Sequence, residues 1–451
     1  MSKQRIQLSD HFTYSRLLRF VLPCIGTMLF TSIYGIVDGL CVSNFVGKTA
    51  FAAVNLIMPV PMLVGSVGFM LGTGGSAIVG ITLGEGDREK ADRYFSLFVW
   101  TGLLAGIVLS AVGVLIVRPA AALLGAKGEM LDYAVRYGRI LMLSLPTFIL
   151  QNMFQSLFVT AEKPHLGFAF TVAAGVTNMV LDVVLVGMLH GGVEGAAIAT
   201  FISQAVGGVL PVFYFLNKRS TSSIHLGRAQ WNGGVIRSAC INGSSELMTN
   251  LSMSLVNILY NYQLLRFAGE NGVAAYGVIM YAAFLFVAVF VGYAVGSAPI
   301  VSYHYGARNH AELNNLYSKS LRLIGVIAVV MTALSMLVIP YVARIFVGYD
   351  AELLALTSHA FRVYALNFFL MGFNVYGSSF FTALGDGVTS ALISFLRTLL
   401  FQLLALILLP MVLGIEGVWL AVTAAEAGAL CVTVLMFITK DKVFHYRKAS
   451  C

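Results

Sequence analysis

The sequence predicts an all-α polytopic membrane protein with twelve transmembrane helices in two six-helix lobes. Its composition is the first reason, because 58% of the 451 residues are hydrophobic and only 11% are charged, whereas a soluble domain carries about 25% charged residues. The second reason is that hydrophobic runs of membrane-spanning length, which is about 20 residues, recur along the whole chain. The third is that the second half of the chain repeats motifs of the first.

The hydrophobic runs and the polar breaks between them define the expected spans. Several runs exceed the minimum length, so we expect tilted helices or helices that extend beyond the bilayer. The expected limits are 17–41, 51–82, 94–117, 131–158, 165–188, 193–215, 236–266, 273–303, 317–346, 354–382, 387–411 and 415–438.

Three pairs of segments carry the internal repeat. They are GGVEGAAIA (191–199) with LGIEGVWLA (413–421) and VTAEKP (159–164) with FTALGD (381–386), both at an offset of 222, and EGDREKAD (85–92) with YGARNHAE (305–312) at an offset of 220. Chance similarity between glycine-rich helices is the alternative, but the shared loop spacing argues against it. Six spans per repeat give both halves the same orientation, related by a pseudo-two-fold axis along the membrane normal.

This repeat predicts the organisation of the chain. We expect an N-terminal lobe at 1–215, a cytoplasmic inter-lobe loop at 216–235, and a C-terminal lobe with a cytoplasmic tail at 236–451. With the N-terminus inside, 19 Lys and Arg residues fall on the cytoplasmic side and 8 outside. This bias favours two cytoplasmic termini. It also explains the net charge of +8 without a nucleic-acid partner.

Several kinds of chemistry have no signature in the sequence. The five cysteines are odd in number and form no CxxC pair, so we interpret them as small core residues. No paired-histidine metal motif and no phosphate-binding ATPase loop occurs, so we expect neither a metal centre nor a cofactor. The polar N-terminus lacks the cleavage site of a signal peptide.

The most informative residues are acids inside hydrophobic spans. Asp182 lies deep in the run TNMVLDVVLVG, Asn178 lies one turn before it, and Asp38 lies in the first span. A carboxylate at membrane depth costs several kcal/mol and is a functional candidate by default. Helix rise places Asp38, Asp182 and Thr200 in the outer half of the membrane. Together with Asn178 they predict a site for a shared proton or for Na+, while helix capping or structural hydrogen bonding is the alternative.

The second half carries different polar residues at depth. By the 222 offset, Asp182 corresponds to Leu404 and Thr200 to Val422, so the acid site is expected in one lobe only. We expect Arg397 to pair with Glu426 or Glu246, because an unpaired charge there would be expensive. The C-lobe polar candidates are Glu246, Asn250, Arg397 and Glu426. Their roles remain open between a structural ion pair and coupling or substrate contact.

Proline and soft apolar side chains complete the candidates. Pro23 lies inside the first span, where it predicts a kink that is either static or a hinge. Methionine and aromatic residues suit an adaptable pocket, although they are also typical of ordinary core. They are Met28, Phe30, Tyr34, Met58, Met62, Met280, Tyr281 and Phe284.

These features together resemble the multidrug and toxic compound extrusion (MATE) transporters. The resemblance covers essentially the whole chain and rests on Pro23, Asp38, NMVLD, Thr200 and the loop LGEGDREKADR (83–93) with its counterpart YGARNHAEL (305–313). The chain looks most similar to the DinF-like bacterial branch, which includes the MepA type. In that branch Asp38, Asn178, Asp182 and Thr200 match the cation site, and Pro23 matches the bending proline. Glu246 resembles the span-seven acid of the NorM-type branch, but the span-ten acid of that branch is missing here.

The resemblance implies an H+- or Na+-coupled antiporter that exports small organic, often cationic or amphipathic, compounds by alternating access. It also implies a multi-pass protein of the bacterial plasma membrane, and we expect a monomer. A lipid or lipid-linked oligosaccharide flippase is the alternative, although Arg397 is the only clear cation at depth for the cationic cavity of such a protein. A membrane enzyme would need a cluster of acids or histidines at a membrane surface, and the sequence offers none.

Overall fold

The computed structural model describes residues 6–447, except for the side chains of residues 36, 38–44 and 48. All the regular secondary structure in this described part is helical. In the first half the elements are α1 (Tyr14–Phe45), α2 (Lys48–Ile57), α3 (Pro59–Gly84), α4 (Arg88–Leu123), α5 (Gly128–Leu143), α6 (Leu145–Thr160), α7 (Pro164–Leu181), η1 (Asp182–Met188) and α8 (Gly192–Leu216). They continue with α9 (Gly233–Asn242), α10 (Ser244–Gly306), α11 (His310–Val347), α12 (Ala351–Ala365), α13 (Phe368–Ala383), α14 (Gly387–Phe395), η2 (Leu396–Leu400), α15 (Phe401–Leu413), α16 (Ile415–Thr439) and α17 (Asp441–Phe444).

The predicted fold class is confirmed, and the helices account for twelve spans. Among the described residues, nine helices are long and apolar enough to cross a membrane, and two bent pairs, α5 with α6 and α12 with α13, add two more. One of the nine, α10, has 63 residues and would be about 95 Å long as a straight helix. Gly269, with φ 60° and ψ −149°, divides it into two antiparallel spans, because glycine tolerates a positive φ without steric cost.

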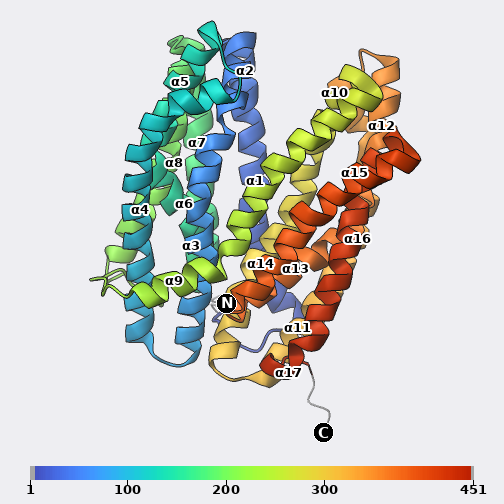
Figure 1. Cartoon of the computed structure of the whole chain (residues 1–451). Helices are drawn as coiled ribbons and strands as arrows, with labels where there is room; N and C mark the ends of the chain where they lie inside the picture. Colours follow the sequence, from blue (N-terminus) through green and yellow to red (C-terminus); the bar gives the residue numbers. More distant parts are fainter. Residues whose placement is uncertain (1–5, 448–451) are drawn as a thin grey trace.

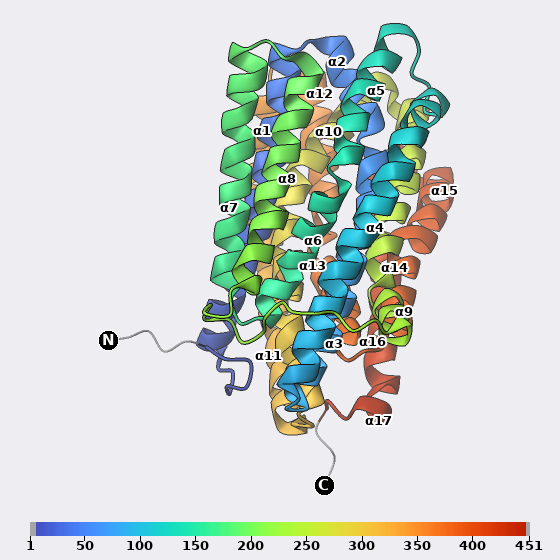
Figure 2. The same cartoon turned by 90° about the vertical axis from the view of Figure 1, so that its left-hand side faces the viewer.

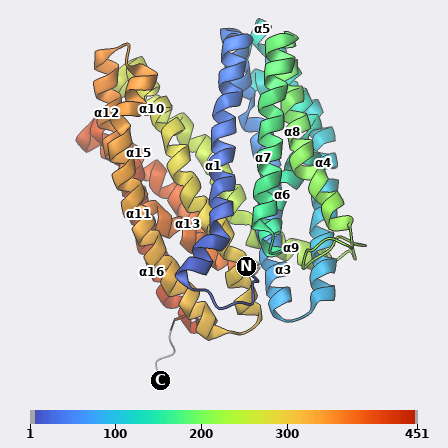
Figure 3. The same ribbon diagram turned by 180° about the vertical axis from the view of Figure 1, so that it is seen from behind.

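The helices form two bundles, which we call the N-lobe (α1–α8) and the C-lobe (α10–α16). In Figure 1 the two bundles lie close together at the bottom and diverge toward the top, and Figure 3 shows the same arrangement from behind. We call the bottom of Figure 1 the lower end. Both described chain ends lie there, as Figure 2 also shows. The span expected at 236–266 begins later, because residues 233–242 form α9, a separate helix that lies across the lower end.

The turns at the lower and upper ends repeat from one half to the other. Gly192 (φ 60°) and Gly414 (φ 58°) are both left-handed and stand 222 residues apart. The N-caps Asp87 and Asn309 also stand 222 residues apart, and each side chain accepts from the backbone N–H three residues later. The 220 offset expected for the 85–92 match is therefore wrong by two residues. A single offset of 222 relates these positions.

Glycines allow α3 and α10 to cross closely at the lower end. A Cβ at Gly84 would collide with the carbonyl oxygen of Tyr303, and a Cβ at Gly306 would collide with that of Ile81. Both glycines and both carbonyls are themselves 222 residues apart. Small residues let transmembrane backbones approach in this way. The two lobes therefore meet through equivalent segments.

A strap formed by residues 6–13 joins the lobes at the same end. The backbone N–H of Leu8 donates to Glu162 Oε1 of the N-lobe (2.8 Å), and that of Phe12 donates to Glu312 Oε1 of α11 (2.9 Å). His11 Nδ1 lies 2.6 Å from Glu312 Oε2. Leu8 and Phe12 are buried. The strap is thus anchored by buried side chains and by one carboxylate from each lobe.

A further contact at the lower end joins two loops of the C-lobe. Asp386 caps α14 by accepting from Thr389, and Lys440 Nζ lies 2.7 Å from its Oδ2. Burial alone would raise the pKa of Asp386, but the hydrogen bonds from Lys440 and Thr389 outweigh it. The pKa of this carboxyl therefore lies below its ordinary value.

Candidate functional site

The N-lobe acid predicted from the sequence is completely buried. Asp182 begins the π-helical segment η1, which continues α7, and its side chain is 0% exposed. Asn178, one turn earlier, is 2% exposed, and its amide nitrogen has no hydrogen-bond partner among the described residues. A buried amide donor without a partner costs free energy. The pair is therefore suited to receive a further polar group or an ion.

The other two members of the predicted N-lobe set are less closely described. Thr200, in α8, is half-buried and donates to the carbonyl of Ala196 in its own helix (3.1 Å). Asp38 lies in α1, but its side chain is outside the described residues. A hydrogen bond from Ser203 Oγ to Ala174 O (2.8 Å) joins α8 to α7. The structure thus brings Asn178 and Asp182 together on one helix, while Thr200 lies on the helix beside them.

Pro23 lies inside α1, as predicted. It lacks a backbone N–H, so the helix loses one hydrogen bond there. Thr27 Oγ1 donates to the Pro23 carbonyl (2.9 Å), and Thr31 Oγ1 donates to the Thr27 carbonyl (2.8 Å). Such side-chain bonds to the preceding turn favour helix bending. This part of α1 is therefore the natural place for the helix to bend.

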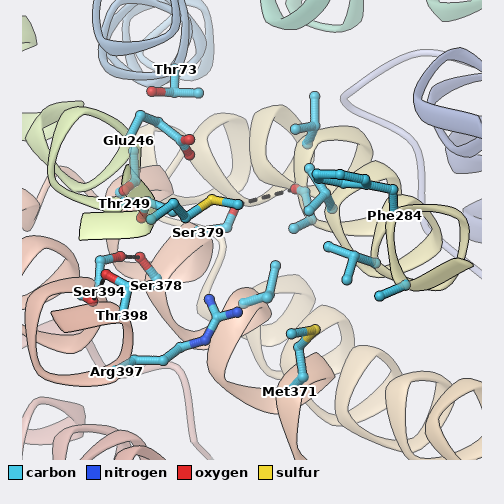
Figure 4. Close-up of a pocket in the computed structure, with 18 of the residues that line it drawn as sticks. Thr73, Glu246, Thr249, Phe284, Met371, Ser378, Ser379, Ser394, Arg397 and Thr398 are labelled. Atoms are coloured by element: carbon cyan, nitrogen blue, oxygen red, sulfur yellow. Dashed lines mark hydrogen bonds between the residues drawn. The ribbon is translucent and has the colours of Figure 1, made fainter. Parts of the chain in front are cut away.

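A cavity of about 330 Å³ lies between the two lobes. Its N-lobe wall comes from α3 and α6, through Thr73, Ser76 and Ser156. Its C-lobe wall comes mostly from α10, α12, α13, α14 and η2. The volume lies within the usual range for small-molecule pockets, about 300–1,000 Å³. Figure 4 shows polar side chains, among them Glu246 and Arg397, interspersed with Phe284 and Met371.

Only part of the predicted soft pocket belongs to this cavity. Met280 and Phe284 line it. Tyr281 instead stacks on Phe346, with ring centroids 6.2 Å apart, and Met62 is 56% exposed. The cavity thus contains methionine and aromatic side chains, as predicted, but most of the eight residues expected in it do not line it.

Arg397 pairs with Glu426, which is one of the two partners that the sequence left open. Arg397 Nε donates to Glu426 Oε1 over 2.8 Å, and Glu426 is 0% exposed. Asn374 Nδ2 donates to the other carboxylate oxygen (2.7 Å), and Thr433 Oγ1 donates to Asn374 Oδ1 (2.8 Å). Each added hydrogen bond helps to offset the cost of burying the carboxylate. We call these four residues the C-lobe network.

The remaining C-lobe candidates are divided by the structure. Glu246, in the first turn of α10, lines the cavity together with Arg397. Asn250 does not line the cavity, and its amide donates to the Glu246 carbonyl in its own helix (2.8 Å). Glu426 does not line the cavity either, but it pairs with Arg397, which does.

Sequence reasoning missed the hydroxyl groups on the C-lobe wall. Ser378 Oγ lies 2.8 Å from Ser390 Oγ and 2.9 Å from Ser394 Oγ, and Thr382 Oγ1 donates to Ser390 Oγ (2.7 Å). Ser390, Ser394 and Thr398 follow one another at intervals of four. This spacing could have revealed the hydroxyl cluster in the sequence, because residues four apart share a helix face.

No group of three or more metal-ligating side chains occurs among the described residues. Three described cysteines, Cys24, Cys240 and Cys431, are free thiols. In the described part of the chain, the polar side chains of the cavity and of the N-lobe site are acids, amides, hydroxyls and one arginine. Such groups suit protons, hard cations and polar organic ligands.

Comparison with known proteins gives a consistent result. A family model named MatE matches residues 23–184 and 247–407, one segment in each half of the chain. Multidrug export protein MepA of Staphylococcus haemolyticus is 22% identical over 437 residues, which cover 97% of this chain and 95% of that protein. MepA of Staphylococcus aureus is 22% identical over 95% of each chain.

Solved structures resemble the fold closely. A crystal structure of MATE in complex with MaL6 superposes with a TM-score of 0.92 at 24% identity, covering 98% of this chain and all of that one. An outward-facing multidrug resistance MATE family transporter of the MOP superfamily superposes with a TM-score of 0.91 at 24% identity, covering 99% of both chains.

Proposed function

The chain belongs to the MatE family and is a transporter, not an enzyme, and we propose that it exports small organic molecules in exchange for H+ or Na+. The substrates are small organic compounds that are often cationic or amphipathic. The observation that carries this proposal is the cavity of about 330 Å³ lined by both lobes, with methionine, aromatic and hydroxyl groups on its walls. Apolar walls with a few polar groups are typical of small-molecule sites, and methionine adapts to ligands of different shape.

The coupling ion binds in the N-lobe, at Asp182 and Asp38, with Asn178 and Thr200 as further ligands. Support comes from the complete burial of Asp182 and from the amide nitrogen of Asn178, which has no hydrogen-bond partner in the described part of the chain. Both H+ and Na+ use carboxylates, and the choice depends on geometry. The C-lobe lacks this site, since Leu404 and Val422 occupy the equivalent positions.

Transport follows alternating access between two lobes, residues 1–215 and 236–451. The protein is a monomer of the bacterial plasma membrane with both termini in the cytoplasm. The lower end is then cytoplasmic, and lobes that meet there correspond to an outward-facing state. Cation binding bends α1 near Pro23, where the helix lacks a backbone hydrogen bond. The bend, together with changed hydrogen bonding between α1, α7 and α8, releases the substrate outward.

The test is substrate efflux from proteoliposomes under separately imposed pH and Na+ gradients. The wild-type protein should respond to one gradient, and that response names the ion. Asp38→Asn and Asp182→Asn should each remove most of the gradient-driven efflux, because a neutral amide neither exchanges a proton nor neutralises a cation.

The matched control is Asp132→Asn, which changes an exposed aspartate of α5 and should leave efflux unchanged. Full gradient-driven efflux in both Asp38→Asn and Asp182→Asn would rule out the N-lobe coupling site. A wild-type protein that exports no organic compound under either gradient would rule out the antiporter itself.

A further inference from the structure

Arg397 presents the free edge of its guanidinium to the cavity. A guanidinium has five N–H donors, and Nε–H is used by Glu426 (2.8 Å). The Nη groups have no hydrogen-bond partner among the described residues, although Arg397 lines the cavity and its side chain is only 12% exposed. Figure 4 shows the guanidinium pointing into the pocket. A purely structural pair would gain more from two parallel bonds to Glu426, so the free edge needs another explanation.

The C-lobe network holds this edge in position. Glu426 is completely buried and receives Arg397 on one oxygen and Asn374 on the other. The Arg397 backbone belongs to the short π-helical segment η2, and such segments are frequent at functional sites. The guanidinium is thus anchored from behind through Nε, while its Nη groups remain available to a ligand.

An acidic side chain lies in the same cavity without forming an ion pair with Arg397. Glu246 lines the cavity but forms no ion pair within 4.0 Å of any described basic side chain. In Figure 4, Glu246 lies at the upper left with Thr249 beside it, and Arg397 lies at the lower left, with Ser378, Ser394 and Thr398 drawn between them. Met371 lies at the bottom of the view and Phe284 at the right. The cavity therefore has an acidic side, a basic side and apolar surface.

From these observations we propose that the cavity binds amphiphilic zwitterions, with the substrate carboxylate on the Nη edge of Arg397 and the substrate cation at Glu246. Guanidinium and carboxylate match in geometry and form two charge-assisted hydrogen bonds. Glu426 and Asn374 act as positioning residues. The inference rests on the proposed export of small organic molecules and narrows the substrate class. Simple cations bind through Glu246 alone.

The experiment compares two probes that differ in one group. One is a cationic xanthene dye with a free carboxylate, and the other is its methyl ester. Binding to the purified full-length protein is followed by fluorescence polarisation, and efflux of each dye is followed in proteoliposomes. Arg397→Lys keeps a charge beside Glu426 but lacks the planar pair of Nη donors. It should weaken binding of the acid dye about tenfold or more, the loss expected for a charge-assisted bond, and leave the ester unchanged.

Two further variants distinguish loss of the carboxylate contact from a general loss of folding. Arg397→Leu combined with Glu426→Leu removes both charges, so no buried carboxylate is left unpaired. Like Arg397→Lys, this double variant should weaken binding of the acid dye and leave binding of the ester unchanged. Glu246→Gln should weaken both dyes, because both carry the cationic group. Arg344→Gln, which changes an exposed arginine of α11, is the control and should affect neither dye.

The results separate this inference from the proposed function. Equal loss of acid and ester in the Arg397 variants, or a wild-type protein that exports the ester but does not bind the acid, would overturn the zwitterion site and leave export intact. A wild-type protein that exports neither dye under either gradient would overturn the zwitterion site, and one that exports no organic compound at all would contradict the proposed function as well. Selective loss of the acid dye in both Arg397 variants supports the site.

Discussion

Glu426 shows, at the scale of a single residue, how a charge is kept inside the membrane. Its carboxylate is 0% exposed and accepts from Arg397 and Asn374, which come from two other elements of the C-lobe. Removing one partner from a buried ion pair costs about 3–5 kcal/mol, because the other charge is left uncompensated. The stability of the C-lobe therefore depends on this one acid.

We expect Glu426→Ala to lower the thermal stability of the purified protein strongly, by about 3–5 kcal/mol in free energy of unfolding. The measurement is the loss of monodisperse protein on heating in detergent. Glu416→Ala is the matched control, because Glu416 lies on the same helix, pairs with His359 and is 44% exposed. Exposed pairs contribute about 0–1 kcal/mol. A similar loss in both variants would contradict the role given to burial.

The sequence predicted the acid–arginine pair but not its supporting groups. A lone arginine at membrane depth is expensive, so a partner such as Glu426 had to exist. Asn374 and Thr433 carry no charge and are common in transmembrane helices, where they join helices by hydrogen bonds. Because burying an uncharged polar group costs much less than burying a charge, nothing in the sequence distinguished Asn374 and Thr433 from other polar residues in the spans.

At the scale of elements, two π-helical segments occur in equivalent spans of the two lobes. Asp182 is the first residue of η1 and Arg397 is the second residue of η2. The two segments therefore present charges of opposite sign. A π-helical turn inserts a residue into the helix and shifts the face on which later side chains lie. No hydrophobic pattern in the sequence indicated either segment.

The strap of residues 6–13 gives a prediction at this scale. Replacing Glu312 with Ala removes the acceptor of the Phe12 N–H and the partner of His11. Hydrogen–deuterium exchange of residues 8–12 should then rise about tenfold or more, since loss of a charged acceptor costs about 1.5–3 kcal/mol. Glu162→Ala should act mainly on Leu8.

The control for the strap is Glu85→Ala. Glu85 lies in another loop of the lower end, is 48% exposed and pairs with Lys90 at 3.6 Å. It should leave exchange in the strap unchanged. Unaltered exchange in Glu312→Ala would show that apolar burial of Leu8 and Phe12 alone holds the strap.

At the scale of the whole molecule, the lobes meet through a symmetric contact. Gly84 lies against the carbonyl of Tyr303, and Gly306 lies against that of Ile81. In a two-fold interface, if one residue of the first half contacts a second residue of the other half, then their equivalents make the reciprocal contact. The two glycine contacts follow this rule. The pseudo-two-fold axis therefore passes close to this crossing at the lower end.

We expect Gly84→Ala to disfavour the state in which the lower ends meet, because overpacking of this kind costs about 1–3 kcal/mol. Spin labels at Leu123 and Tyr349, which are 88% and 84% exposed at the upper ends of the two lobes, should then give shorter distances in a cysteine-free background. Gly277→Ala is the control, because a Cβ at Gly277 would meet nothing within 4 Å. An unchanged distance distribution in Gly84→Ala would show that the crossing tolerates the methyl group.

Residue type and spacing alone predicted that the chain spans a membrane twelve times, that its halves repeat, and that Asp182 and Arg397 are costly exceptions. These conclusions follow from the hydrophobic effect and from the price of a charge in lipid, which both act on residue type and spacing. Helix packing was needed to show that Glu426 is the partner of Arg397, that Glu246 shares a cavity with Arg397, and that hydroxyls from α13 and α14 form one cluster. Those facts depend on how helices far apart in sequence are rotated and packed, which a hydrophobic pattern does not specify.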